Sequence, residues 1–207
     1  MSYCNWDRTS LLNQKYHDEE WGIPVHDDRV QFEYLMLEVM QCGLNWDLVI
    51  QKRELFRHCF DNFNYNLIAK YNSKDIQRII ETDGMIKSKR KIEAVINNAK
   101  YFQEIRKEFG SFCNYIWSYT EGKTILYDGH NIGYIPVSNG LSEIISKDLK
   151  KRGFKFIGPV TIYSHLQAAG IINDHDENCP RYKFINSKFP TVRKEKYLEK
   201  DISYFGD

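Results

Sequence analysis

The sequence lacks the features that would indicate a membrane protein or a disulfide-bonded secreted protein. It has no run of about 18 apolar residues, so no membrane-spanning helix is expected. Its first residues are polar and aromatic, without the apolar segment of a secretory signal. Cysteine is scarce, with 5 in 207 residues, and we expect free thiols or metal ligands rather than disulfides. We therefore expect a cytoplasmic protein without membrane contact.

Net charge is also nearly absent. Lys and Arg number 29 against 28 Asp and Glu, which gives a formal net charge of +1. The overall charge therefore does not indicate nucleic-acid binding, and any basic face must be local. Aromatic residues, by contrast, make up 14% of the chain. A chain of this length can bury a core as one large domain or as two closely packed lobes.

The spacing of apolar residues predicts a mostly α-helical protein, which we class as all-α. Asn45, Ser73 and Ser88 are suited to cap three of the helices. The segment 123–138 has only weak strand signals, and no clean periodicity follows Pro180. Helices are expected over residues 28–42, 46–60, 74–81, 89–109, 141–152 and 159–169.

Two pairs of cysteine and histidine lie near opposite ends of the chain. Cys4 and His17 are near its start, and His175 and Cys179 are near its end. Four such ligands suit a tetrahedral zinc ion, and a site closed by four protein side chains is structural. The spacing matches no zinc-finger motif, so on spacing alone a buried thiol with surface histidines is the favoured alternative.

The stretch "LKKRGFKFIGPVTIYSHLQAAG" predicts two helices joined by a short turn between Gly153 and Gly158. Such a turn brings backbone N–H groups close to a ligand, and the second helix directs its positive N-terminal end towards phosphate. Lys155 adds positive charge, together with Lys150, Lys151 and Arg152 of the preceding helix end. A helix-hairpin-helix that binds DNA phosphate and an ordinary turn with solvated lysines fit this pattern equally well.

Aromatic residues and one carboxylate form a third candidate site. Trp6, Tyr16, Trp21 and Trp46 lie early in the chain, and Glu38 belongs to a strongly apolar helix. Such a set suits a flat, positively charged ring, by stacking, cation–π contact and hydrogen bonds from exocyclic N–H groups to the carboxylate. The pattern alone favours the alternative, in which the tryptophans are core residues and Glu38 is solvated.

Taken together, these residues resemble a known family. The stretches "YHDEEWGIPVHDD", "LEVMQCGLNWDLVIQKRE" and "KRGFKFIGPVTIYSHLQAAGIINDH", followed by Cys179, are similar to the 3-methyladenine DNA glycosylase I family. The resemblance runs from about residue 3 to residue 181. It implies a helix-hairpin-helix DNA glycosylase fold with a structural zinc, in a glycosylase domain of residues 1–181 with two packed helical lobes. It leaves residues 182–207 as a C-terminal tail of unknown role.

The resemblance also implies a role for each candidate residue. The zinc ligands are Cys4, His17, His175 and Cys179. The catalytic residue is Glu38, and the base-binding residues are Trp6, Tyr16, Trp21 and Trp46. The DNA-binding residues are Gly43 and Leu44, as a wedge in the gap left by a flipped base, and Gly153, Lys155 and Gly158 of the hairpin.

The implied activity is hydrolysis of the N-glycosidic bond of 3-methyladenine in double-stranded alkylated DNA. Free 3-methyladenine is the product, and we expect a monomer. No lysine nucleophile is indicated, so the enzyme is expected to be monofunctional. Asp174 and Asp176 follow the hairpin, where the wider superfamily has an Asp, but the matched family does not use it, and we assign no general base.

The sequence departs from the family at three positions around the expected pocket. Asn13 replaces a tyrosine, Val39 replaces a small residue and Asn45 replaces a serine. Val39 directly follows Glu38 and is expected to crowd the pocket, whereas Asn45 should still cap its helix. Two alternatives therefore stay open: a non-catalytic zinc-stapled helix-hairpin-helix module that binds damaged DNA, and a helical protein whose aromatic residues are all core.

Overall fold

The computed structural model describes Cys4, Trp6, residues 10–130 and residues 135–195. Parts of the weak strand segment (131–134) and of the predicted tail (196–207) lie outside the described residues. The described chain is mostly helical, as predicted, with one small parallel sheet. Its elements are α1 (Leu11–Glu19), α2 (Asp28–Gln41), α3 (Trp46–Gln51), α4 (Arg53–Cys59), η2 (Asp61–Phe63), α5 (Tyr65–Ile68), α6 (Ser73–Glu81), α7 (Lys89–Phe109), α8 (Phe112–Ser118), β1 (Thr124–Tyr127), α9 (Gly140–Lys151), α10 (Pro159–Ala168), α11 (Pro180–Lys188) and β2 (Thr191–Lys194).

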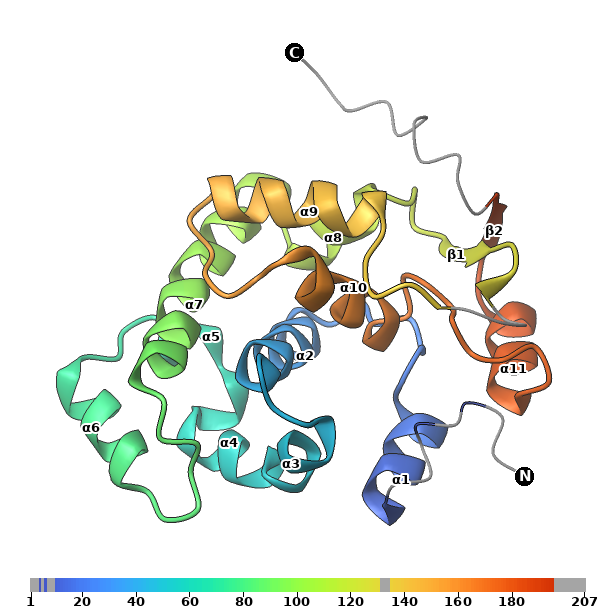
Figure 1. Cartoon of the computed structure of the whole chain (residues 1–207). Coiled ribbons are helices and arrows are strands. Elements are labelled where there is room, and N and C mark those ends of the chain that lie inside the picture. Colours follow the sequence, from blue (N-terminus) through green and yellow to red (C-terminus); the bar gives the residue numbers. More distant parts are fainter. Residues whose placement is uncertain (1–3, 5, 7–9, 131–134, 196–207) are drawn as a thin grey trace.

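Helix α2 lies at the centre of the fold. Every residue from 31 to 40 is buried. The Asp27 side chain accepts a hydrogen bond from the Val30 N–H and starts the helix, and Gly43, with φ of 75°, follows its end. A helix that is buried all round must be enclosed by other elements. In Figure 1, α10 lies next to α2 and α9 lies beyond α10, and α3, α7, α8 and η2 also pack against α2.

Helix α7 is the longest element, with 21 residues. The predicted apolar stripe is buried, and Gly110, with φ of 82°, ends the helix as expected. It packs against α2, α5, α6 and α8. The stripe consists of Ile92, Val95, Ile96, Ala99 and Phe102.

The single helix expected over 46–60 is wrong, because the chain breaks at Lys52 into α3 and α4. Arg53 begins α4, and its buried guanidinium donates to Glu33 at 2.7 Å and to both carboxylate oxygens of Glu20 at 2.8 and 2.7 Å. The apolar periodicity does not encode these polar contacts. The N-cap of α6 is likewise Asn72, which forms a capping box with Asp75, and not Ser73.

The first part of the predicted tail is folded. Residues 180–188 form α11, and 191–194 form β2, which pairs in parallel with β1 from Thr124↔Thr191 to Tyr127↔Lys194. In Figure 1 this small sheet and α11 lie on the same side of the molecule as α1. The two ends of the described chain therefore meet on one side.

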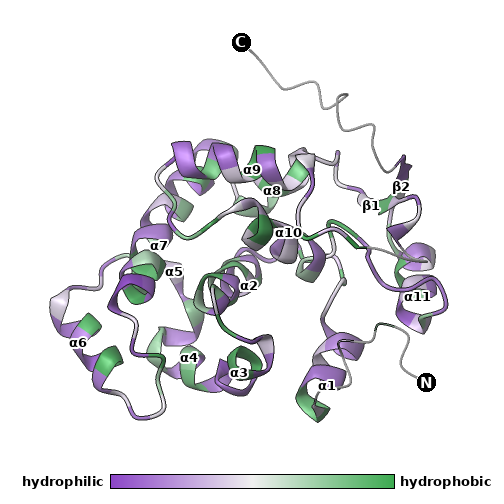
Figure 2. Ribbon diagram, in the orientation of Figure 1, coloured by the Kyte–Doolittle hydropathy of each residue, from purple (hydrophilic) through white to green (hydrophobic). Residues whose placement is uncertain are grey.

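The outer helices are amphipathic. Figure 2 shows hydrophilic and hydrophobic residues along both α6 and α9, and α9 buries Leu141, Ile145 and Leu149 at four-residue intervals. Among the residues that the structure describes, no helix combines the length and the apolar character needed to cross a lipid bilayer.

Candidate functional site

A cavity of about 420 Å³ lies beside the C-terminal half of α2. It brings together the four predicted base-binding residues and the predicted catalytic residue, although they come from different parts of the chain. Tyr16 lies on α1, Glu38 on α2 and Trp46 on α3, so three helices form one wall. The predicted residues that line the cavity are Trp6, Tyr16, Trp21, Glu38 and Trp46.

Glu38 is the acidic residue of this cavity, and its side chain is largely withdrawn from water, with 6% exposed. Burial raises the pKa of Glu38 to about 8, and in the described part of the chain neither a hydrogen bond nor a neighbouring charge offsets this effect. The alternative, in which Glu38 is a solvated residue, is therefore wrong. A cation bound in the cavity would favour the ionised carboxylate, because opposite charges lower the pKa of an acid.

The aromatic rings surround this carboxylate. The Tyr16 and Trp46 ring centroids are 5.2 Å apart with a 44° tilt, and the Trp6 and Trp21 rings meet edge to face at 4.9 Å. Burial raises the pKa of the Tyr16 phenol well above its ordinary value, so the hydroxyl stays neutral. The cavity thus offers flat apolar surfaces next to one acidic group, which suits a planar cationic ligand.

The three positions that depart from the family lie outside this cavity. Successive helical residues point about 100° apart, so Val39 does not share the direction of Glu38. Glu38 faces the cavity, whereas Val39 is fully buried in the core. The expectation that Val39 crowds the pocket is therefore wrong. The Asn13 side chain is buried and donates to Asp47. Asn45 caps α3 as predicted, by accepting from the Asp47 N–H at 2.8 Å.

The opposite wall of the cavity was not predicted from the sequence. Four residues of α10 line it at the spacing of one helical face, which is a signal that the sequence contains. That helix was considered only for its N-terminal end, so the signal was missed. The additional lining residues are Gln41, Ile135, Pro136, Val137, Val160, Tyr163, Ser164 and Gln167.

A buried polar cluster supports the α10 wall from behind. The Tyr163 hydroxyl and the Gln167 side-chain amide donate to Asp174 Oδ2 at 2.6 and 2.8 Å, and His130 Nδ1 lies 3.0 Å from Asp174 Oδ1. The Asp174 side chain is fully buried, and both of its oxygens are engaged. Asp176 instead accepts from the Asn178 N–H in the following loop. Neither carboxylate lines the cavity, which agrees with leaving the general base unassigned.

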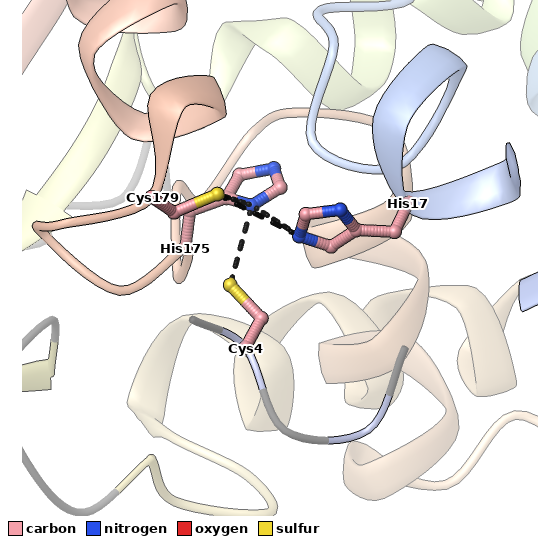
Figure 3. Close-up of side chains that lie close together, drawn as sticks. All are labelled: Cys4, His17, His175 and Cys179. Carbon is pink, nitrogen blue, oxygen red and sulfur yellow. Dashed lines mark hydrogen bonds between the residues drawn. The ribbon is translucent and has the colours of Figure 1, made fainter. Parts of the chain in front are cut away.

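The four predicted metal ligands meet in one cluster. Figure 3 shows that the side chains of Cys4, His17, His175 and Cys179 point towards one another, and their ligand atoms all lie within 4.8 Å of each other. His175 Nδ1 is 3.1 Å from His17 Nε2 and 3.6 Å from Cys4 Sγ. Cys179 Sγ is 3.7 Å from each of these two nitrogens. The cluster could hold a metal ion.

Contacts around the cluster orient the two imidazoles. His175 Nε2 bonds the Trp21 carbonyl at 3.0 Å, and His17 Nδ1 lies 2.8 Å from Asp18 Oδ1, so the other nitrogen of each ring faces the cluster. Burial lowers the pKa of His175 to about 3, which keeps the ring neutral. A Cβ on Gly22, whose φ is 80°, would lie 2.8 Å from His175 Nε2. Only glycine fits this approach.

The two segments predicted to touch DNA are neighbours. Leu44 follows Gly43 and is 38% exposed. In the turn between α9 and α10, Lys155 is exposed while Phe154 and Ile157 are buried. Cys42 Sγ lies 3.7 Å from the Phe156 carbonyl oxygen and 3.6 Å from Thr161 Oγ1, so the end of α2 abuts the turn.

One of the basic residues near the turn is neutralised. Arg152 donates to Asp148 and Glu108, each at 2.6 Å. Its contribution to a positive face is therefore small. Lys150, Lys151 and Lys155 are exposed and carry the local positive charge.

Known proteins resemble this chain over most of its length. The family model for methyladenine glycosylase matches residues 6–182. The chain is 37% identical to DNA-3-methyladenine glycosylase 1 of Escherichia coli K12, over 88% of this chain and 97% of that protein. A crystal structure of 3-methyladenine DNA glycosylase I superposes with a TM-score of 0.82 at 38% identity, covering 86% of this chain and 98% of the other. A variant of 3-methyladenine DNA glycosylase I in complex with 3-methyladenine gives 0.81 at 32%, covering 87% and 97%.

The burial of Glu38 predicts a pH-dependent stability difference. In the folded protein the pKa of Glu38 is about 8, against an ordinary value of 4.5. The contribution of the Glu38 proton to the free energy of unfolding is therefore complete below pH 4.5, falls as the pH rises above 4.5, and is lost once the pH has passed 8. Glu38→Gln cannot ionise, and its stability relative to wild type should grow by about 3 kcal/mol between pH 4.5 and 7. Urea unfolding across this range measures the difference. The exposed Glu104→Gln is the matched control, and parallel profiles for wild type and Glu38→Gln would contradict the prediction.

Proposed function

Because this chain belongs to the methyladenine glycosylase family, we propose that it removes 3-methyladenine from alkylated double-stranded DNA by hydrolysing the N-glycosidic bond. The observation that carries this proposal is the position of Glu38. It is a buried carboxylic acid with a pKa of about 8, in a cavity that is also lined by the rings of Trp6, Tyr16, Trp21, Trp46 and Tyr163. A buried carboxylate repels an anion and attracts a cation. Among flat ligands, such a site therefore binds a cation most favourably.

The chemistry of the lesion matches this cavity. A 3-alkylated adenine in DNA carries a positive charge, so the base is already activated as a leaving group and needs less acid catalysis. Glu38 accepts hydrogen bonds from the adenine edge and stabilises the cation, while Tyr16 and Trp46 stack on the ring. The cavity can receive the base only after it leaves the DNA stack, which costs a few kcal/mol and less for a weakened pair.

The sugar is attacked by water in this proposal. Among the described residues that line the cavity none is a lysine, so no amine is available there to form a covalent intermediate with the sugar. We therefore propose a monofunctional enzyme whose product is free 3-methyladenine. Asp174 stays a structural acceptor behind the α10 wall, because its oxygens are already hydrogen-bonded.

We propose that the DNA contacts come from two adjacent segments. Helices α9 and α10, with the turn from Gly153 to Gly158, act as a helix-hairpin-helix whose backbone N–H groups and exposed Lys155 bind phosphate. Gly43 and Leu44 enter the gap that the flipped base leaves. Leu44 is exposed and lies beside the hairpin turn, which supports this assignment.

We propose that the metal of the Cys–His cluster is zinc. A tetrahedral zinc ion with bonds of about 2.0 Å to nitrogen and 2.3 Å to sulfur would separate its ligand atoms by roughly 3.3 to 3.8 Å. The separations among His17, His175 and Cys179 and between His175 and Cys4, 3.1 to 3.7 Å, are close to this range, and all four ligand atoms lie within 4.8 Å of one another. Four protein ligands leave no open position, so the ion is structural. It would hold Trp21, whose carbonyl bonds His175, at the cavity wall.

We also propose that residues 1–181 form a glycosylase domain of two packed lobes, and that the protein acts as a cytoplasmic monomer. Helix α11 crosses its C-terminal limit, so the described part of 182–207 extends the domain. The alternative of a binding module drew its support from Asn13, Val39 and Asn45. None of the three lines the cavity, and this support is therefore lost.

The proposed activity is tested by release of free base from methylated duplex DNA, separated by chromatography. Wild type should release 3-methyladenine, and Glu38→Gln should release it about 10²-fold more slowly, because the site loses the charge that stabilises the cation. Glu104→Gln, an exposed substitution on α7, should match wild type. A folded wild-type protein that binds the DNA without releasing base would instead be a binding module.

The zinc assignment is tested by metal analysis of purified protein. Cys179→Ser should lower the zinc content from about one ion per chain and reduce thermal stability in parallel, because a closed four-ligand site contributes directly to folding. Cys59→Ser, at a buried cysteine outside the cluster, should reduce stability without loss of zinc. Unchanged zinc content in Cys179→Ser would exclude the assignment.

The phosphate contact is tested by the salt dependence of binding to undamaged duplex. Lys155→Glu should weaken binding and reduce the slope of log K against log [salt] by about 1, the value for one lost phosphate contact. Lys183→Glu makes the same charge change on α11, on the other side of the molecule in Figure 1, and should leave the slope unchanged. An equal effect of the two variants would indicate only a response to net charge.

A further inference from the structure

Helix α7 binds the hairpin turn through buried amides. Asn98 is fully buried, and its side chain holds both backbone groups of Lys155: Oδ1 accepts from the Lys155 N–H at 2.8 Å, and Nδ2 donates to the Lys155 carbonyl at 3.0 Å. The neighbouring Asn97 donates to the Gly153 carbonyl at 2.8 Å. A turn has few hydrogen bonds between its own backbone groups. These three bonds from α7 therefore fix the backbone conformation at Gly153 and Lys155.

Two further α7 side chains cover the same turn. A Cβ on Gly153, whose φ is 102°, would lie 2.5 Å from the Tyr101 ring, so the ring and the backbone are in direct contact. The Arg90 guanidinium lies 5.7 Å from the centre of the Phe156 ring. Phe156 itself has a φ of 58°, an unfavourable conformation for a side-chain-bearing residue. The turn is therefore held in a conformation that it would not adopt alone.

The same helix also binds the end of α2. Lys91 is 7% exposed, and its Nζ donates to the Met40 carbonyl at 2.7 Å. This carbonyl belongs to the last turn of α2, where the unpaired carbonyls of a helix favour a positive charge. Met40 lies three residues before Gly43. Lys91 and Asn98 are seven residues apart, which places them about two turns apart along one side of α7.

A stiff connection of this kind matters for two loops that must act together. Backbone N–H groups bind phosphate only when their directions are fixed, and a wedge is effective only at one distance from them. The direct contacts through Cys42 are weak thiol contacts of 3.6 and 3.7 Å. An α-helix rises about 1.5 Å per residue and is stiff over this length, so it sets a separation that loops cannot set.

We propose that Lys91, Asn97 and Asn98 are positioning residues that hold the Gly43–Leu44 segment and the hairpin turn in register for DNA. The proposal rests on the proposed function, in which both segments contact DNA. None of the three lines the cavity. They therefore affect the affinity for duplex DNA and not the recognition of the base.

The test separates these two steps. Asn98→Leu keeps the shape of the side chain without its hydrogen bonds, and Lys91→Met removes the charge. Lys107→Met, at an exposed α7 residue paired with Glu104, is the matched control. Three quantities are measured for each folded variant: amide hydrogen exchange at residues 153–158, affinity for undamaged duplex, and affinity for free 3-methyladenine by tryptophan fluorescence.

Asn98→Leu should accelerate exchange of the Lys155 amide and weaken duplex binding by about ten-fold or more, as misplacement of contact groups does. Lys91→Met should weaken duplex binding similarly, and binding of free 3-methyladenine should change less than two-fold in both. Asn97→Ala, which removes a single bond at a half-buried site, provides a milder variant if Asn98→Leu does not fold.

Faster exchange with unchanged duplex affinity would overturn the proposal, because the turn would then be held without consequence for DNA. Equal losses of duplex and free-base binding would also overturn it, since they would indicate a general structural role. Failure of the proposed function is distinguishable, because it is read from wild type alone: wild type would release no base, or would bind neither duplex nor base, while the exchange data would still report the contacts of Asn98.

Discussion

The burial of every residue from 31 to 40 of α2 is the constraint on which the remaining structure depends. A helical stretch that is buried on all sides must be covered by other elements, and α7 and α10, from distant parts of the chain, supply much of this cover. Glu38 is carried into the interior as part of the same helix. No described residue pairs with its carboxyl group, which is the cost of building a site in the core, and the extensive apolar burial around it offsets that cost.

Helix α1 is held to this core mainly by polar and aromatic contacts. Only Asn13, Tyr16 and His17 of its residues are buried, while Leu11 is 82% exposed. Its C-terminal end is fixed by Glu20, which binds the Arg53 guanidinium through both oxygens. His17 joins the Cys–His cluster. One wall of the cavity therefore depends on specific pairings rather than on apolar area, which makes its position exact but sensitive to single substitutions.

Local signals in the sequence were sufficient for the parts of the fold that local chemistry determines. The limits of α2 followed from Asp27 and Gly43, and Asn45 caps α3 as its side chain predicts. The Cys–His set was indicated by residue type, although spacing alone favoured the opposite interpretation. The ion pair of Arg53, just after the break at Lys52, and the neutralisation of Arg152 join separate parts of the chain, which periodicity does not contain. The pairing of β1 with β2 joins segments more than sixty residues apart, and their weak strand signals become effective only together.

The Cys–His cluster also constrains the order in which the protein can be completed during synthesis. His17 and His175 are 158 residues apart in sequence, and Cys4 and His175 are 171 apart. Contacts of such long range form late, because the intervening chain must first be made and folded. A ribosome that has released only the first helices has produced Tyr16, Glu38 and Trp46 without the opposite wall or the cluster. The nascent chain therefore completes this cavity only after α10 and the cluster residues have been made, and a product truncated before them lacks it.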